Sequence, residues 1–150
     1  QGAKAVWLAC PDAIALCRCD EAATDVERVQ VIHELVERGR FEPNLQRARL
    51  GLRERRDAML AALSETFPSG VSWNRPEGGY FLWLDLPEGE RVADLQVRAA
   101  LDGVAIVPGF GFFPANTDLG GSSARLAFSY ETPARITEGI ERLARLHADE

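Results

Sequence analysis

Hydrophobic positions cluster as short apolar runs in the second half of the chain. Three runs with strand character lie at residues 79–86, 104–107 and 124–130, between turns and one helical segment. Each run ends at a turn signal that contains proline, and the first closes at Pro87-Glu88-Gly89. We therefore predict three core strands around which the rest of the chain packs.

Apolar residues at helical spacing predict four helices. Thr24 and Glu27 form a capping box at the start of the first, and Pro133 has the favoured first position of the last. The expected helices span 24–38, 43–66, 92–101 and 133 onward, with a short edge strand at 71–74. The last helix carries an apolar stripe of Ile136, Ile140, Leu143 and Leu146.

These elements together predict an α+β fold, an α/β sandwich. Its sheet would be small, mixed but mainly antiparallel, and covered by helices. Alternation along 79–86 places Leu82 and Leu84 on one face and Phe81 and Trp83 on the other. Since both faces are largely apolar, we expect both to be covered.

Composition narrows the classes of function. The chain has 150 residues, a hydrophobic fraction of 46% and a net charge of −6, which is typical of one soluble domain. The acidic total argues against a nucleic-acid partner, and no run reaches the length of a membrane helix. The chain shows no secretory leader and starts at Gln1 instead of Met, so we expect a piece of a longer cytoplasmic protein.

Two side-chain clusters have competing interpretations. The helix 43–66 carries five arginines, which could bind nucleic acid, but acidic neighbours such as Glu54 favour a solvated face. Cys17 and Cys19 could bind a metal with His33, but a closed zinc site needs four ligands. We therefore favour the interpretation that these two cysteines, together with Cys10, are partly buried and pack as small apolar residues.

Arg125 is the strongest candidate for chemistry. It shares one strand face with small residues such as Ser123 and Ala127. The opposite face, which carries Leu126, Phe128 and Tyr130, is expected to be apolar core. The small neighbours leave room for a ligand, and a guanidinium grips a carboxylate through two parallel hydrogen bonds. The alternative is an arginine that is exposed or paired within the domain.

The phenylalanines of the following loop have two interpretations of equal weight. Phe110, Phe112 and Phe113 could wall an apolar substrate pocket or simply pack the loop. Gly78-Gly79 could permit close approach of a ligand or strand, although a turn into the strand explains the pair.

The tyrosines and histidines carry no predicted catalysis. We expect Tyr80 and Tyr130 in the core or the sheet, and neither His33 nor His147 shows the partners of a catalytic triad.

Three ordered motifs carry a family resemblance: P-E-G-G-Y-F-L-W at 76–83, G-V-A-I-V-P-G-F-G-F-F at 103–113 and R-L-A-F-S at 125–129. Their order resembles the C-terminal small domain of the class I/II, fold-type-I aminotransferases, which use pyridoxal phosphate (PLP). The aminoadipate/kynurenine branch and the GntR/MocR regulators look most similar.

The resemblance implies roles for two residues. Arg125 would bind the α-carboxylate of an amino-acid substrate. The opening G-A-K-A-V-W resembles the segment that follows the PLP-binding lysine, so Lys4 would contact the cofactor phosphate where the family has arginine. The lysine that carries PLP would lie before Gln1. We therefore expect no covalently bound PLP on this chain, and an inactive enzyme when it stands alone.

The same resemblance implies an organisation. Residues 1–40 would be a remnant of the large PLP-binding domain, and 41–150 the small domain that begins with a long bridging helix. The parent would be a homodimer that exchanges an amino group between an amino acid and a 2-oxo acid. The alternatives are an effector-sensing domain of a GntR/MocR-type regulator and a truncated, non-catalytic association module.

Overall fold

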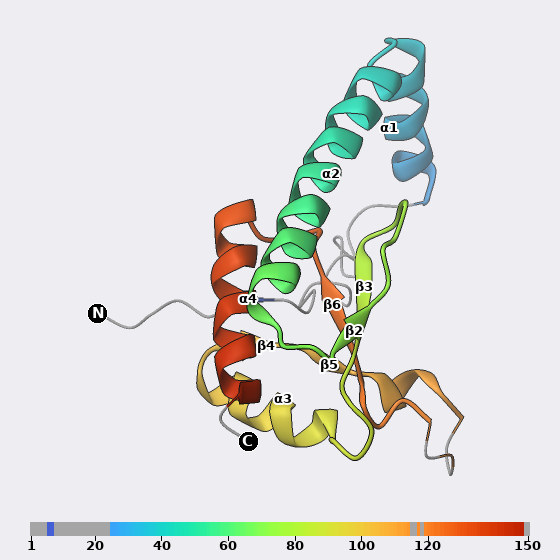
Figure 1. The fold of residues 1–150 in the computed structure, drawn as a ribbon. Helices are drawn as coiled ribbons and strands as arrows, with labels where there is room; N and C mark the ends of the chain where they lie inside the picture. Colours follow the sequence, from blue (N-terminus) through green and yellow to red (C-terminus); the bar gives the residue numbers. More distant parts are fainter. Residues whose placement is uncertain (1–5, 8–24, 115–116, 118, 149–150) are drawn as a thin grey trace. The chain divides into compact units, whose positions relative to one another are not determined.

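A computed structural model describes residues 6–7, 25–114, 117 and 119–148, with side chains described from residue 29 onward. The chain divides into two compact units, one of Pro11–Arg53 and one that joins Gln1–Cys10 to Glu54–Glu150. Figure 1 shows the fold. The predicted division into 1–40 and 41–150 as parts of two parent domains stays a prediction.

The smaller unit holds helix α1 (Asp25–Glu37) and the first half of α2 (Phe41–Thr66). Both begin and end within two residues of the predicted helices. The capping box rests on Thr24, which lies outside the described residues. Gly39 ends α1 with a left-handed φ of 63°, and its N–H donates to the Val36 carbonyl at 2.9 Å.

The larger unit contains a four-stranded antiparallel sheet in the order β2-β3-β6-β5. Its strands are β2 (Ser72–Trp73), β3 (Phe81–Asp85), β6 (Ser123–Ala127) and β5 (Val107–Pro108). A second pair, β1 (Val6–Trp7) and β4 (Val104–Ala105), is parallel. The predicted α+β class, with a mixed and mainly antiparallel arrangement, is confirmed.

The predicted strand at 104–107 is wrong as a single strand. Val104–Ala105 pairs with β1, whereas Val107–Pro108 pairs with β6 in the other sheet. Ile106 lies between the two halves and is only 4% exposed. Four consecutive apolar residues predict burial, but they do not reveal that the run changes partner half-way.

Three helical segments cover one face of the four-stranded sheet. They are the second half of α2, α3 (Val92–Leu101) and α4 (Pro133–Ala148). Figure 1 shows α4 and the C-terminal turns of α2 on the same side of β3 and β6. The largest fully buried side chains come from this layer, the facing strands and the residue after β6: Met59, Leu63, Leu82, Leu84, Leu95, Leu126, Phe128, Ile136, Ile140 and Leu143.

The opposite face of the sheet is less covered than expected. Phe81 and Trp83 are half-buried, and Asp85 is exposed. The helices supply one apolar layer only, so within the described residues the alternate positions of β3 keep contact with solvent.

Three predicted core positions are also wrong. Tyr130 is 54% exposed because β6 already ends at Ala127, and Tyr80 is equally exposed just before β3. On α4, Leu146 is half-buried, whereas the neighbouring His147 is only 8% exposed.

The arginines of α2 divide into two groups. Arg47, Arg49 and Arg53 are exposed, as a solvated face requires. Arg55 Nε donates to the Glu131 carbonyl at 2.9 Å, and Arg56 Nη1 donates to a backbone carbonyl at 3.2 Å. These two arginines therefore attach the second half of α2, which belongs to the larger unit, to loops of that same unit.

None of the helices in the described ranges is both long and apolar enough to cross a membrane.

Candidate carboxylate-binding site at Arg125

Arg125 lies at the middle of β6, between two neighbouring strands. In the antiparallel registers it pairs with Trp83 of β3 on one side and Val107 of β5 on the other. Its neighbours Ala124 and Leu126 are fully buried under the helices. Because strand residues alternate, the half-buried Arg125 side chain belongs to the other face.

Two aromatic rings contact the guanidinium of Arg125. Its Cζ atom lies 4.0 Å from the ring centroid of Phe81 and 4.6 Å from that of Phe112. Phe112 in turn meets Trp83 edge to face, with centroids 5.3 Å apart and planes at 83°. Cations are attracted to such ring faces. The three motif segments, far apart in sequence, therefore converge on one guanidinium.

Arg125 has an unused hydrogen-bond donor. Its Nε is buried and has no hydrogen-bond partner among the described residues, which also provide no ion pair to this side chain. Asp85 of β3, an acid on the same face of the sheet, accepts a hydrogen bond from Ser123 Oγ at 2.6 Å. Buried polar groups normally find partners. A guanidinium with available donors is suited to a carboxylate, which it can bind through two hydrogen bonds.

Two glycines allow the aromatic loop to pack against β6. The loop contains the short helix η3 (Gly109–Phe112). A Cβ on Gly109 would lie 2.8 Å from the Ser123 Cβ. Gly120 has a φ of +75°, and its Cβ would lie 2.6 Å from the Phe113 ring. Neither position has room for a side chain, so both glycines help to place Phe112 over Arg125.

The structure separates the three loop phenylalanines, which sequence alone left undivided. Phe112 contacts Arg125 and Trp83, and Phe113 packs against Gly120. Phe110 is 51% exposed. At Gly79, φ is +81° and a Cβ added there would meet no atom within 4 Å, so the turn explanation accounts for this glycine.

Comparisons with known proteins identify the family of the chain. No family model matches the chain. The chain is 43% identical over 115 residues to aromatic-amino-acid aminotransferase 1 of Thermococcus litoralis, covering 77% of this chain and 27% of that protein. It also superposes on LysN, the α-aminoadipate aminotransferase of Thermus thermophilus, with a TM-score of 0.77 and 35% identity, covering 94% of this chain and 36% of that one. The chain is a PLP aminotransferase-like domain.

Transcription regulators share the aminotransferase-like domain. The regulator TauR of Rhodobacter capsulatus is 33% identical over 108 residues, which cover 71% of this chain and 22% of that protein. The resemblance to aminotransferases and to these regulators is thus confirmed, as is the fold. The chain spans about a quarter of the length of the curated relatives it matches.

The predicted cofactor contact lies outside the described part of the domain. Lys4 is not among the described residues, and those residues contain no lysine, the residue type that carries PLP in the family. The described residues therefore do not fit PLP by themselves, and no cofactor contact follows from them. Cys10, Cys17 and Cys19 also lie outside, and the described residues form no group of ligands that could hold a metal.

His147 has a partner that sequence reasoning missed. Its Nε2 lies 2.8 Å from Glu90 Oε2, and its ring packs 5.7 Å from that of Phe67. These residues are far apart in sequence, so no local pattern connects them. With its 8% exposure, His147 joins the end of α4 to the turn before α3 as part of the packing.

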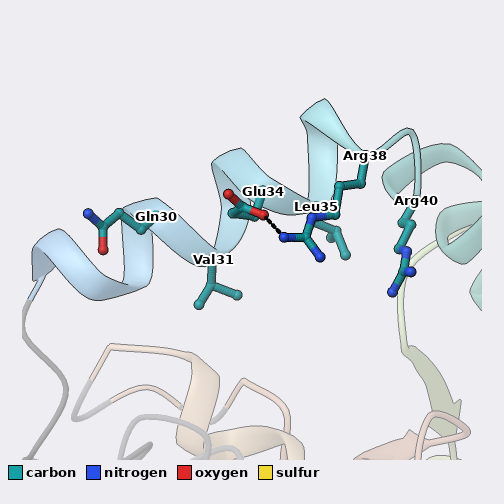
Figure 2. Close-up of a pocket in the computed structure, with 6 residues that line it drawn as sticks. All are labelled: Gln30, Val31, Glu34, Leu35, Arg38 and Arg40. Atoms are coloured by element: carbon teal, nitrogen blue, oxygen red, sulfur yellow. Dashed lines mark ion pairs between the residues drawn. The ribbon is translucent and has the colours of Figure 1, made fainter.

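The smaller unit contains a surface hollow that includes none of the predicted site residues. Figure 2 shows its lining side chains and the ion pair between Glu34 and Arg38, 2.5 Å apart. The hollow has a volume of about 470 Å³. Both charged side chains are more than 60% exposed. An exposed pair of this kind contributes little free energy, so we assign no chemistry to the hollow.

Proposed function

We propose that the chain is the C-terminal, substrate-carboxylate-binding domain of a PLP-dependent aminotransferase acting on an amino acid and a 2-oxo acid. The observation that supports this most is the Arg125 guanidinium, which two rings contact while its buried Nε has no described partner. Both substrate types carry a carboxylate beside the reacting carbon. A bidentate pair with Arg125 would hold either one in a fixed orientation.

PLP is the proposed cofactor of the parent protein, with Lys4 contacting its phosphate and no covalent attachment to this chain. When bound, PLP supplies the electron sink that lets an amino group be exchanged. Arg125 would bind and orient the substrate. We place the reaction in the cytoplasm.

The test is Arg125→Ala in the full-length protein. A charge-assisted hydrogen bond contributes about 1.5–3 kcal/mol, and each 1.4 kcal/mol is about a factor of ten. We therefore expect kcat/KM for an amino acid to fall by roughly ten- to several hundred-fold. The control substrate is the same amine without its carboxylate, which should react equally with both proteins. Equal slowing of the two substrates, or no slowing of either, would reject Arg125 as the carboxylate ligand. PLP absorbance should be unchanged, since the cofactor is held elsewhere.

A second candidate function has a specific observation in its favour, the 33% identity to the regulator TauR. In this alternative, the domain is the effector-sensing part of a GntR/MocR-type regulator. Arg125 would still bind a carboxylate. The full-length protein would instead bind DNA, in a manner that changes when the carboxylate ligand is added. A band-shift assay beside the transamination assay separates the two functions.

A homodimer is the proposed assembly of the parent protein. In the alternative of a truncated, non-catalytic association module, self-association would be the main role of the chain. Apolar side chains are exposed along the smaller unit: Val29, Val31, Ile32, Val36 and Phe41. Exposed apolar surface of this kind favours association. We expect sedimentation of the chain to show self-association that Ile32→Asp and Val36→Asp reduce. A clean monomer at high protein concentration would contradict this assembly.

A further inference from the structure

We infer that Phe81 and Phe112 are positioning residues, whose rings hold the Arg125 guanidinium ready for an incoming carboxylate. The inference rests on the proposed function of Arg125 as the carboxylate ligand. It adds two residues that do not themselves contact the substrate carboxylate, and gives each a role through Arg125.

The two rings reach Arg125 from separate parts of the fold. Phe81 pairs with Ala127 on β6 and so lies diagonally across from Arg125, within reach of a long side chain. Phe112 belongs to η3, which directly follows β5, the strand on the other side of β6 from β3. Two independent segments therefore restrict one flexible side chain.

Phe112 is itself held in place. Trp83 contacts the Phe112 ring edge to face and fixes it from one side. Trp83 is also the residue directly opposite Arg125 in the strand register. Gly109 and Gly120 fix the loop from behind by packing without side chains. The ring thus has little freedom to leave the guanidinium.

Aromatic contacts hold a cation in a way that an acidic partner would not. A carboxylate partner would accept the N–H bonds of Arg125 and compete with the ligand for them. A ring face attracts the cation through its π-electrons and accepts no conventional N–H bond from it, so the guanidinium donors are not taken up by an acid; the buried Nε, for example, has no described partner. An arginine ordered before binding also loses less conformational freedom when the ligand arrives.

A simple packing role is the competing explanation, since both rings also bury apolar surface. The two explanations differ in what replaces the ring. Leucine keeps apolar bulk but removes the π-face, whereas tyrosine keeps the face. Phe110→Leu is the matched control, because Phe110 lies in the same loop and is 51% exposed.

The experiment titrates this chain with propionate and follows the NMR chemical shifts of the backbone amides of β6, which every variant retains. Propionamide, of similar shape but uncharged, is the second probe. We expect Phe81→Leu and Phe112→Leu to weaken propionate binding by about three- to thirtyfold. Phe81→Tyr, Phe112→Tyr and Phe110→Leu should bind within about twofold of the unmodified chain. Propionamide binding should be negligible throughout.

Each outcome decides between the explanations. If both leucine variants bind propionate as the unmodified chain does, while Arg125→Ala does not bind it, the positioning role is wrong and the carboxylate site stands. If Arg125→Ala still binds propionate, the proposed function itself fails. If a leucine variant also loses thermal stability, its tyrosine counterpart decides. A tyrosine variant that binds normally supports the role, and one that has lost binding overturns it.

Discussion

Arg125 and Leu126 are neighbours on one strand, yet they serve opposite faces of the sheet. Leu126 is fully buried beneath the helices, together with the similarly buried Leu82 and Phe128. Arg125 is half-buried, contacts two aromatic rings and keeps an unsatisfied Nε. The buried face provides most of the apolar stabilisation, whereas the other face offers a charged group to a ligand.

The comparison shows how the first face serves the second. Leu82 pairs with Leu126, and this pair in the core sets the register that places Trp83 opposite Arg125. A shift by one residue would send the leucines to the open face and Arg125 into the core. The hydrophobic face therefore determines where the guanidinium lies, and substitutions on the two faces should have separable effects.

The largest expected effect is on the core face. Leu126→Ala removes a side chain with no solvent exposure, and such changes cost about 2–5 kcal/mol of unfolding free energy. Urea denaturation followed by circular dichroism measures it. Arg125→Ala should cost less than about 1 kcal/mol in the same assay. Equal losses for the two variants would show that the faces do not divide the roles.

Gly120→Ala tests the loop that places Phe112. A left-handed φ of +75° is unfavourable for alanine, and the new Cβ would overlap the Phe113 ring. We expect a loss of about 1–3 kcal/mol, together with weaker carboxylate binding. Gly89→Ala is the matched control, because Gly89 has a φ of +96° but open space around it. If the control loses as much stability and affinity, the close packing at Gly120 is not the cause.

Arg125→Lys gives the smallest effect of the three and refines the description of the open face. Lysine keeps the charge but lacks the planar fork. We expect about a tenfold loss of carboxylate affinity, equivalent to about 1.4 kcal/mol, with stability changed by less than about 0.5 kcal/mol. Propionate titration measures the affinity. Unchanged affinity would mean that charge alone, without planar geometry, binds the ligand.

Local patterns predicted much of the fold. The helix at 92–101 is confirmed residue for residue, and Pro133 begins α4 as expected. Alternation correctly placed Leu82 and Leu84 on one face, and both are fully buried. These features depend on spacing within one segment, which the sequence contains in full.

The remaining features depend on which distant segments meet. Arg125 was identified as the candidate, but its contact with Phe81 depends on strand register, and that with Phe112 depends on the loop path. Burial of His147 instead of Leu146 depends on Glu90 and Phe67, both far away in the chain. No periodicity within a single segment encodes such pairings.

The pairing of β1 with β4 has a consequence for the order of folding. Val6 and Trp7 pair in parallel with Val104 and Ala105. This short ladder therefore closes a loop that contains all the residues between Trp7 and Val104. Closing a long loop costs entropy before any contact compensates it, and distant pairings slow folding. We expect this ladder to form last and to open first. The amides of Val104 and Ala105 should therefore exchange with deuterium before those of β3 and β6, while the face that carries Arg125 stays intact.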